Sequence, residues 1–182
     1  MRVVKTSLPG VLILEPRVFS DERGDFLEAW NDRRFAEIIG TPTEFVQDNQ
    51  SRSRRGVLRG LHYQLVRPQG KLVHVIDGAV FDVAVDIRRT SDNFGKWFGV
   101  ELTSQNRRQL WVPPGFAHGF YAISEMACVA YKVSDYYARE WDRSIRWDDP
   151  ELGIEWPTGA EAPLVSPKDA GAPFLRDAEI YE

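Results

Sequence analysis

The sequence predicts an all-β fold of the sandwich or barrel type that carries one short helix. Short apolar segments recur about every 8–14 residues, and Gly, Pro, Asn and Asp separate them. The clearest segment is residues 79–87 (AVFDVAVDI), in which the large apolar side chains occupy every second position. Together these features indicate many short strands arranged as a sandwich or barrel.

The expected strands follow one another along most of the chain. Residues 77–78 (DG) predict a tight hairpin between two of them. After Pro150 the chain is rich in Pro and Gly, so we expect a tail of loops and short helical turns that wraps the barrel. In order, the expected strands cover residues 11–16, 26–30, 44–50, 56–64, 71–76, 79–87, 94–102, 109–112, 119–124, 126–137 and 144–147.

One segment, residues 31–40 (NDRRFAEIIG), has helical spacing instead. Asn31 or Asp32 can cap the first turn, and the apolar residues at positions 35, 38 and 39 share one helical face. Gly40 can end the helix, because glycine readily adopts the left-handed conformation found there. We therefore expect one short helix among the strands.

Composition limits the classes of function. A chain of 182 residues is long enough for one domain, residues 1–182, with its own core. The net charge is −4 and no basic run stands out, which argues against nucleic-acid binding. The apolar run at residues 11–14 is too short for a signal or a membrane span. Because Cys128 is the one cysteine, no internal disulfide can form, and we expect a cytoplasmic protein without a membrane partner.

The histidines do not form a metal-binding pattern. The strand count fits a double-sheet jelly roll of the cupin type. Metal-binding cupins carry a His-x-His pair and a Glu on one strand and a further His later. Here His62 stands alone in residues 62–64, and His118 follows in residues 114–118. Because a metal site needs three or four ligands, we expect no metal. We interpret His74, which lies between apolar residues, as a histidine without a catalytic role.

Residues 56–64 (GVLRGLHYQ) place polar side chains in a strand that begins apolar. In a regular strand, Arg59 and His62 would point to opposite faces. A bulge at Gly60 would allow both to reach one cavity. Cations and aromatic side chains recur elsewhere in the chain. Arginine suits phosphate oxygens and aromatic faces suit a nucleobase, so this combination suggests a nucleotide-linked substrate.

Several blocks of sequence carry a closer resemblance, and they occur in order over nearly the whole chain. With them the chain resembles the dTDP-4-dehydrorhamnose 3,5-epimerases, a family of cupin jelly rolls that use no metal or cofactor and form homodimers. The resemblance implies a dTDP-4-keto-6-deoxyhexose substrate. The blocks are residues 19–31, 47–53, 56–64, 69–88, 112–120, 131–137, 144–157 and 166–169.

The resemblance also implies a role for individual residues. His62 matches the catalytic base, Asp169 its carboxylate partner, Tyr131 the general acid and Lys71 the lysine near the substrate's C4 oxygen. Tyr137 matches the position that stacks on thymine. Asp142 stands where many members have Glu, which leaves its role open. The residues that match substrate-contacting positions are Phe19, Arg23, Glu28, Gln47, Asp48, Asn49, Arg59, His118, Tyr137, Asp142 and Lys168.

These residue types suit the implied reaction. The ketone at C4 acidifies the C–H bonds at C3 and C5, and inversion needs a base on one face and a proton donor on the other. Histidine suits the base, because its ordinary pKa is about 6.5. Three alternatives stay open at this point: an epimerase that inverts only C3 or only C5, a non-catalytic sugar-nucleotide-binding cupin, and a metal-dependent oxygenase.

Overall fold

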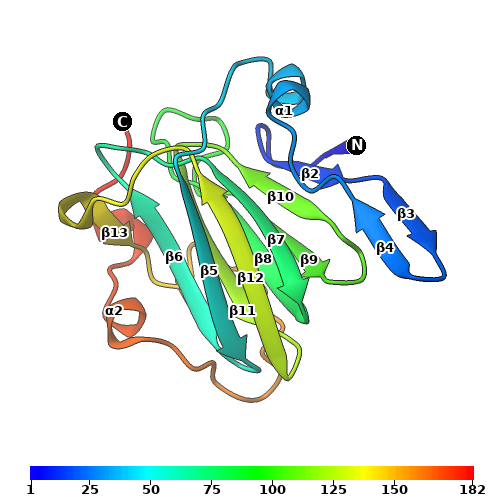
Figure 1. Cartoon of the computed structure of the whole chain (residues 1–182). Helices are drawn as coiled ribbons and strands as arrows, with labels where there is room; N and C mark the ends of the chain where they lie inside the picture. The colour runs from blue at the N-terminus through cyan, green and yellow to red at the C-terminus, as the bar shows by residue number, and fades with distance from the viewer.

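The computed structural model describes residues 1–182, and its strands form two antiparallel sheets that pack face to face (Figure 1). The six-stranded sheet has the order β1 (Arg2–Lys5), β2 (Leu12–Glu15), β10 (Gln109–Val112), β7 (Lys71–Asp77), β12 (Met126–Val133) and β5 (Gln47–Arg54). The five-stranded sheet has the order β13 (Asp142–Ser144), β6 (Leu58–Gln64), β11 (Phe116–Ala122), β8 (Ala79–Asp86) and β9 (Trp97–Thr103). This double-sheet arrangement confirms the predicted all-β jelly roll.

The helix forms where its capping residues predict it. Helix α1 (Asp32–Ile39) begins after Asn31, whose side chain accepts a hydrogen bond from the Arg34 N–H, and ends at Gly40, which has a φ of 81°. The only other α-helix is the single turn α2 (Pro167–Ala170). Neither helix has the length or the apolar character that a membrane-spanning helix needs.

A two-stranded hairpin projects from the body of the molecule (Figure 1). It consists of β3 (Val18–Asp21) and β4 (Gly24–Leu27). The prediction of a strand at residues 26–30 found only part of β4 and missed β3. The reason is that β3 is exposed along its whole length, so neither of its faces has the buried pattern that reveals a strand. Strand β1, also largely exposed, was missed for the same reason.

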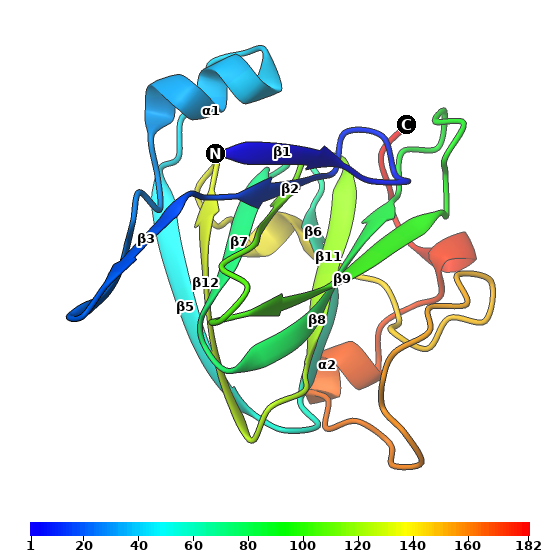
Figure 2. The same cartoon turned by 90° about the vertical axis from the view of Figure 1, so that its right-hand side faces the viewer.

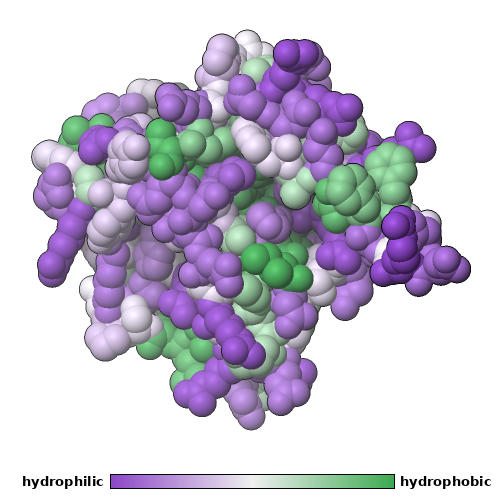
Figure 3. Space-filling view, viewed as in Figure 1, coloured by the Kyte–Doolittle hydropathy of each residue, from purple (hydrophilic) through white to green (hydrophobic).

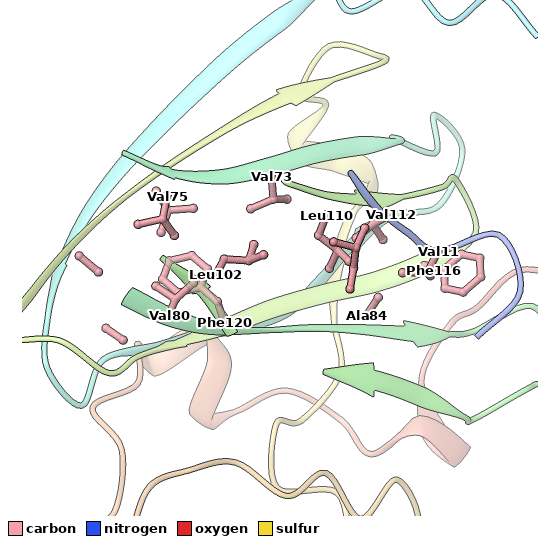
Figure 4. Packing of buried hydrophobic residues seen from close by; sticks show 14 of the residues in the cluster. Val11, Val73, Val75, Val80, Ala84, Leu102, Leu110, Val112, Phe116 and Phe120 are labelled. Atoms are coloured by element: carbon pink, nitrogen blue, oxygen red, sulfur yellow. The ribbon is translucent and has the colours of Figure 1, made fainter. Parts of the chain in front are cut away.

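The main hydrophobic core fills the space between the two sheets (Figure 4). Strand β8 contributes to it through Val80 and Ala84, while Val83 and Val85 face a second core on the other side of the same sheet. The chain beyond Pro150 covers that second core with residues such as Leu152 and Leu175, and it runs along the outside of the five-stranded sheet (Figure 2). The prediction of a tail that wraps the barrel is therefore confirmed.

Strand β6 has the bulge that Gly60 predicts. In the pairing of β6 with β11, His62 lies opposite His118 and Arg59 lies opposite Phe120. Between these two pairs β6 therefore contains one residue more than β11, which is a β-bulge. Gly60 has a φ of 140°, and a Cβ there would lie 2.5 Å from the Cα of Gly119. Both features require glycine. The bulge turns Arg59 and His62 toward the same cavity.

Candidate active site

A cavity of about 430 Å³ opens between the two sheets. Strands β5, β7 and β12 of one sheet and β6, β11 and β13 of the other all contribute side chains to it. The structure brings most of the predicted site residues together here. Those that line the cavity are His62, Lys71, Tyr131, Gln47, Asn49, Arg59, His118, Tyr137, Asp142 and Lys168.

His62 and Asp169 form a hydrogen-bonded pair at the cavity wall. The His62 Nε2 atom lies 2.6 Å from Asp169 Oδ1, and the side chains are 34% and 3% exposed. Asp169 lies on α2, where the Ser166 hydroxyl accepts a hydrogen bond from its N–H. Burial alone would raise the pKa of Asp169, but hydrogen bonds, above all the one from His62, hold that pKa below its ordinary value. The ionised carboxylate fixes the ring and leaves Nδ1 without a protein partner, free to accept a proton.

Lys71 is the buried cation of the site. It opens strand β7, and its Nζ donates a hydrogen bond of 3.1 Å to the carbonyl of His62. Burial lowers the pKa of Lys71 to about 8, although the negative charges of Asp82 and Asp142 act in the opposite direction. An ammonium held in a buried site interacts strongly with an oxygen that gains negative charge.

Tyr131 lies on β12, in the other sheet from His62. Burial raises the pKa of its phenol, and the charge of Arg59 only partly opposes this. The phenol therefore keeps its proton at neutral pH, as a proton donor must. The cavity thus holds an imidazole on one sheet and a protonated phenol on the other.

A polar network surrounds Tyr137 at the outer end of the cavity. The Tyr137 hydroxyl donates to Asp142 Oδ2 at 3.0 Å, and Lys168 Nζ lies 2.5 Å from the same oxygen. The backbone N–H of Tyr137 donates to the side chain of Gln47, which in turn donates to Asn49. Because the Tyr137 side chain is largely exposed, its ring can serve as a stacking surface.

Four predicted contact residues lie outside the cavity of this chain. Phe19 and Arg23 belong to the projecting hairpin, where Arg23 pairs with Asp21. Glu28 pairs with Arg34 at 2.8 Å. Their contacts with substrate stay predictions.

Asp48 is the fourth, and its contact with substrate also stays a prediction. Strand alternation turns it to the face of β5 opposite Gln47 and Asn49, where it pairs with Lys132. The structure therefore gives it no direct place in the cavity. His74 also lies outside the cavity, on β7 between the core residues Val73 and Val75.

Sequence reasoning missed two buried residues at the site. Asp82 Oδ1 lies 2.8 Å from Nε2 of His118, inside the barrel. Alternation gave no signal for it, because most of the large apolar side chains of β8 lie on the other face of the strand. Gln64 lines the cavity and makes three hydrogen bonds to the loops that flank Tyr137. No group of three or more His, Cys, Asp or Glu side chains is arranged to hold a metal ion.

Comparison with known proteins identifies the family. A family described as dTDP-4-dehydrorhamnose 3,5-epimerase matches residues 5–177. The dTDP-4-dehydrorhamnose 3,5-epimerase of Salmonella typhimurium is 54% identical, with 100% of each chain covered. A dTDP-4-dehydrorhamnose 3-epimerase of Streptomyces niveus is 42% identical, covering 98% of this chain and 86% of that relative.

A solved structure agrees with these matches. It is the dTDP-6-deoxy-D-glucose-3,5-epimerase of Legionella pneumophila in complex with dTDP-4-keto-L-rhamnose. It has a TM-score of 0.95 and 51% sequence identity, and the match covers 98% of this chain and 94% of that one. The cavity, its histidine–carboxylate pair and these full-length matches agree: the chain belongs to the dTDP-4-dehydrorhamnose 3,5-epimerase family.

Proposed function

We propose that this chain is an isomerase that inverts C3 and C5 of dTDP-4-keto-6-deoxy-D-glucose and yields dTDP-4-keto-L-rhamnose. The observation that carries the proposal is the pair of His62 and Asp169, which faces a cavity that also holds Lys71 and Tyr131. Proton transfer next to a ketone needs a base, an acid, and a cation that stabilises the oxygen as it gains negative charge.

The first step is removal of a proton next to the ketone. His62 takes the proton through Nδ1, while Asp169 stabilises the imidazolium that forms. The electron pair of the broken C–H bond moves to the C4 oxygen and gives an enolate. The Lys71 ammonium stabilises that oxygen, and preorganised charge of this kind contributes about 3–4 kcal/mol in enzymes.

The second step places a proton on the opposite face of the carbon. Tyr131 donates it and becomes a tyrosinate, which regains a proton from solvent. The imidazolium of His62 also returns its proton to solvent. The same sequence at the second carbon completes the reaction, and no cofactor enters any step.

Anchoring of the nucleotide would position the sugar for both steps. The resemblance assigns Arg59 to substrate contact, and its guanidinium suits the pyrophosphate. Tyr137 offers its exposed ring to thymine. Binding energy from these remote groups orients the reacting carbons against His62 and Tyr131.

Proton NMR in deuterated water tests the proposal. Incubation with dTDP-4-keto-6-deoxy-D-glucose, with the product trapped by a downstream reductase, should give deuterium at C3 and C5 and inverted configuration at both. Absence of exchange at either carbon would contradict the proposal. Exchange and inversion at one carbon alone would show a mono-functional epimerase, the second candidate. The similarity to the Streptomyces niveus relative, which is named a 3-epimerase, favours keeping that candidate.

We also infer a homodimer in which the β3–β4 hairpin of each copy reaches the cavity of the other. The hairpin projects from its own chain, and apolar side chains gather on it at the surface (Figure 3). Phe19 and Phe26 are 50% and 71% exposed, which favours contact with a second surface. A docked hairpin would bring Phe19, Arg23 and Glu28 to a substrate that their own chain does not let them reach.

We place the protein in the cytoplasm. A nucleotide-linked sugar as substrate and a single half-buried cysteine without a disulfide support this location. Fractionation of cells that express the tagged chain would test it, with recovery outside the cytoplasmic fraction as the contradicting result.

A further inference from the structure

Asp82 belongs to a second histidine–carboxylate pair in the barrel. It lies on β8 and is completely buried, and its Oδ1 lies 2.8 Å from Nε2 of His118. His118 lies on β11 directly opposite His62 of β6, and both histidines line the cavity. The family resemblance assigns a role to His118 but none to the carboxylate behind it.

The second oxygen of Asp82 shows that its charge is not fully compensated by His118. Oδ2 is buried and has no hydrogen-bond partner. A buried carboxylate in this condition is costly unless a positive charge lies nearby. Lys71 supplies such a charge, because the field of Asp82 is the largest influence that opposes the effect of burial on the pKa of Lys71.

A chain of contacts links Asp82 to the reacting end of the cavity. Asp82 holds His118, His118 lies opposite His62, and the His62 carbonyl accepts a hydrogen bond from Lys71. The other charged groups that act on Lys71 are Asp142 of β13, which raises its pKa, and Lys168 of α2, which lowers it. Asp82 is therefore the acid that acts on Lys71 from within the barrel.

We propose that Asp82 is a positioning residue of the active site, which orients the imidazole of His118 and holds Lys71 as an ammonium beside the C4 oxygen. This inference rests on the proposed epimerase function. Asp82 itself transfers no proton. Its negative charge keeps the cation of the site in the state that stabilises the enolate.

Asp86 of the same strand provides a matched control. It is also completely buried, but its carboxylate is saturated by Arg88 at 2.6 Å and by the hydroxyl of Ser91, and it does not line the cavity. The change Asp86→Asn therefore removes a buried charge from β8 without touching the site. It should lower stability and leave kcat unchanged.

The test compares Asp82→Asn with Asp86→Asn and wild type in steady-state kinetics and in dTDP binding. We expect Asp82→Asn to bind dTDP as wild type does and to lose at least about tenfold in kcat, because oriented charge acts mainly in the transition state. The fall of kcat at high pH should also begin at lower pH, because Lys71 has lost a counter-charge. A merely structural role would not move that part of the pH profile.

A double variant makes the test sharper. If Asp82 acts through Lys71, Asp82→Asn adds little to the loss already caused by Lys71→Met. Should Asp82→Asn fail to fold, Asp82→Ser leaves room for water and serves in the same measurements. Unchanged kcat and pH profile in a folded variant would overturn the inference, while the wild type would still exchange deuterium at C3 and C5. Absence of that exchange in wild type would contradict the proposed function itself.

Discussion

Lys71 is a single residue whose buried charge lowers the stability of the fold. The residue is only 7% exposed, and its pKa is lowered to about 8, mainly by burial. Below that pH the folded protein carries a buried ammonium, which unfolding would return to water. Between pH 8 and the ordinary lysine pKa, the unfolded chain binds more protons than the folded chain. The contribution of Lys71 to stability therefore rises with pH across this window.

Lys71→Met should therefore stabilise the protein while it removes activity. A shift from 10.5 to about 8 corresponds to a cost on the order of 3 kcal/mol at neutral pH. Urea unfolding at pH 7 should show a higher free energy of unfolding for the variant, and the difference should shrink toward pH 10. A variant that is less stable than wild type at pH 7 would show that the ammonium of Lys71 stabilises the fold.

At the scale of elements, two short features place the pair of His62 and Asp169: the bulge in β6 and the single turn α2. The bulge could be predicted, because glycine inside a strand that carries misplaced polar residues is a local signal. Asp169 could be placed beside His62 only through family resemblance, because 107 residues separate them in the chain. Helix α2 also carries Lys168, so this one turn contacts both His62 and the network around Tyr137.

Gln64 supports that network through hydrogen bonds to the backbone on either side of Tyr137. Its Nε2 donates to the carbonyls of Arg67 and Tyr136, and its Oε1 accepts from the N–H of Ala138 at 2.8 Å. Gln64→Met keeps the volume but leaves these backbone groups unpaired, at a cost of about 1–3 kcal/mol. We expect the KM for substrate to rise several-fold with little change in kcat, because the loop that presents Tyr137 loosens.

The equally buried Gln109 gives a control for this prediction. It donates to the carbonyl of Ala29 and lies outside the cavity. Gln109→Met should lower the melting temperature but leave KM unchanged. A Gln64→Met enzyme with the KM of wild type would show that Tyr137 does not depend on this glutamine.

At the scale of the whole molecule, alternation and turn residues were enough to predict two packed sheets, one helix and a wrapping tail. They could not predict the β3–β4 hairpin, because an element exposed on both faces leaves no periodic pattern. Nor could they find Asp82, since its partner His118 lies on another strand and only folding brings them together. One domain over residues 1–182 and the homodimer stay predictions.

Mixed dimers provide the test of the shared site. Arg23→Ala and His62→Ala variants are each expected to be nearly inactive. After they are mixed and allowed to exchange subunits, about half of the dimers are mixed, and each mixed dimer holds one intact cavity. Activity should return to about a quarter of the wild-type value. No recovery after verified exchange would show that Arg23 does not act across subunits.

The most direct measurement compares His62→Ala and Tyr131→Phe for deuterium exchange and inversion by proton NMR. His62→Ala should lose exchange at C3 and C5, because no base remains to break either bond. Tyr131→Phe should still exchange protons but fail to invert C3 or C5, because the donor on the opposite face is missing. If both variants still exchanged protons and inverted C3 and C5, the assignment of base and acid would be contradicted.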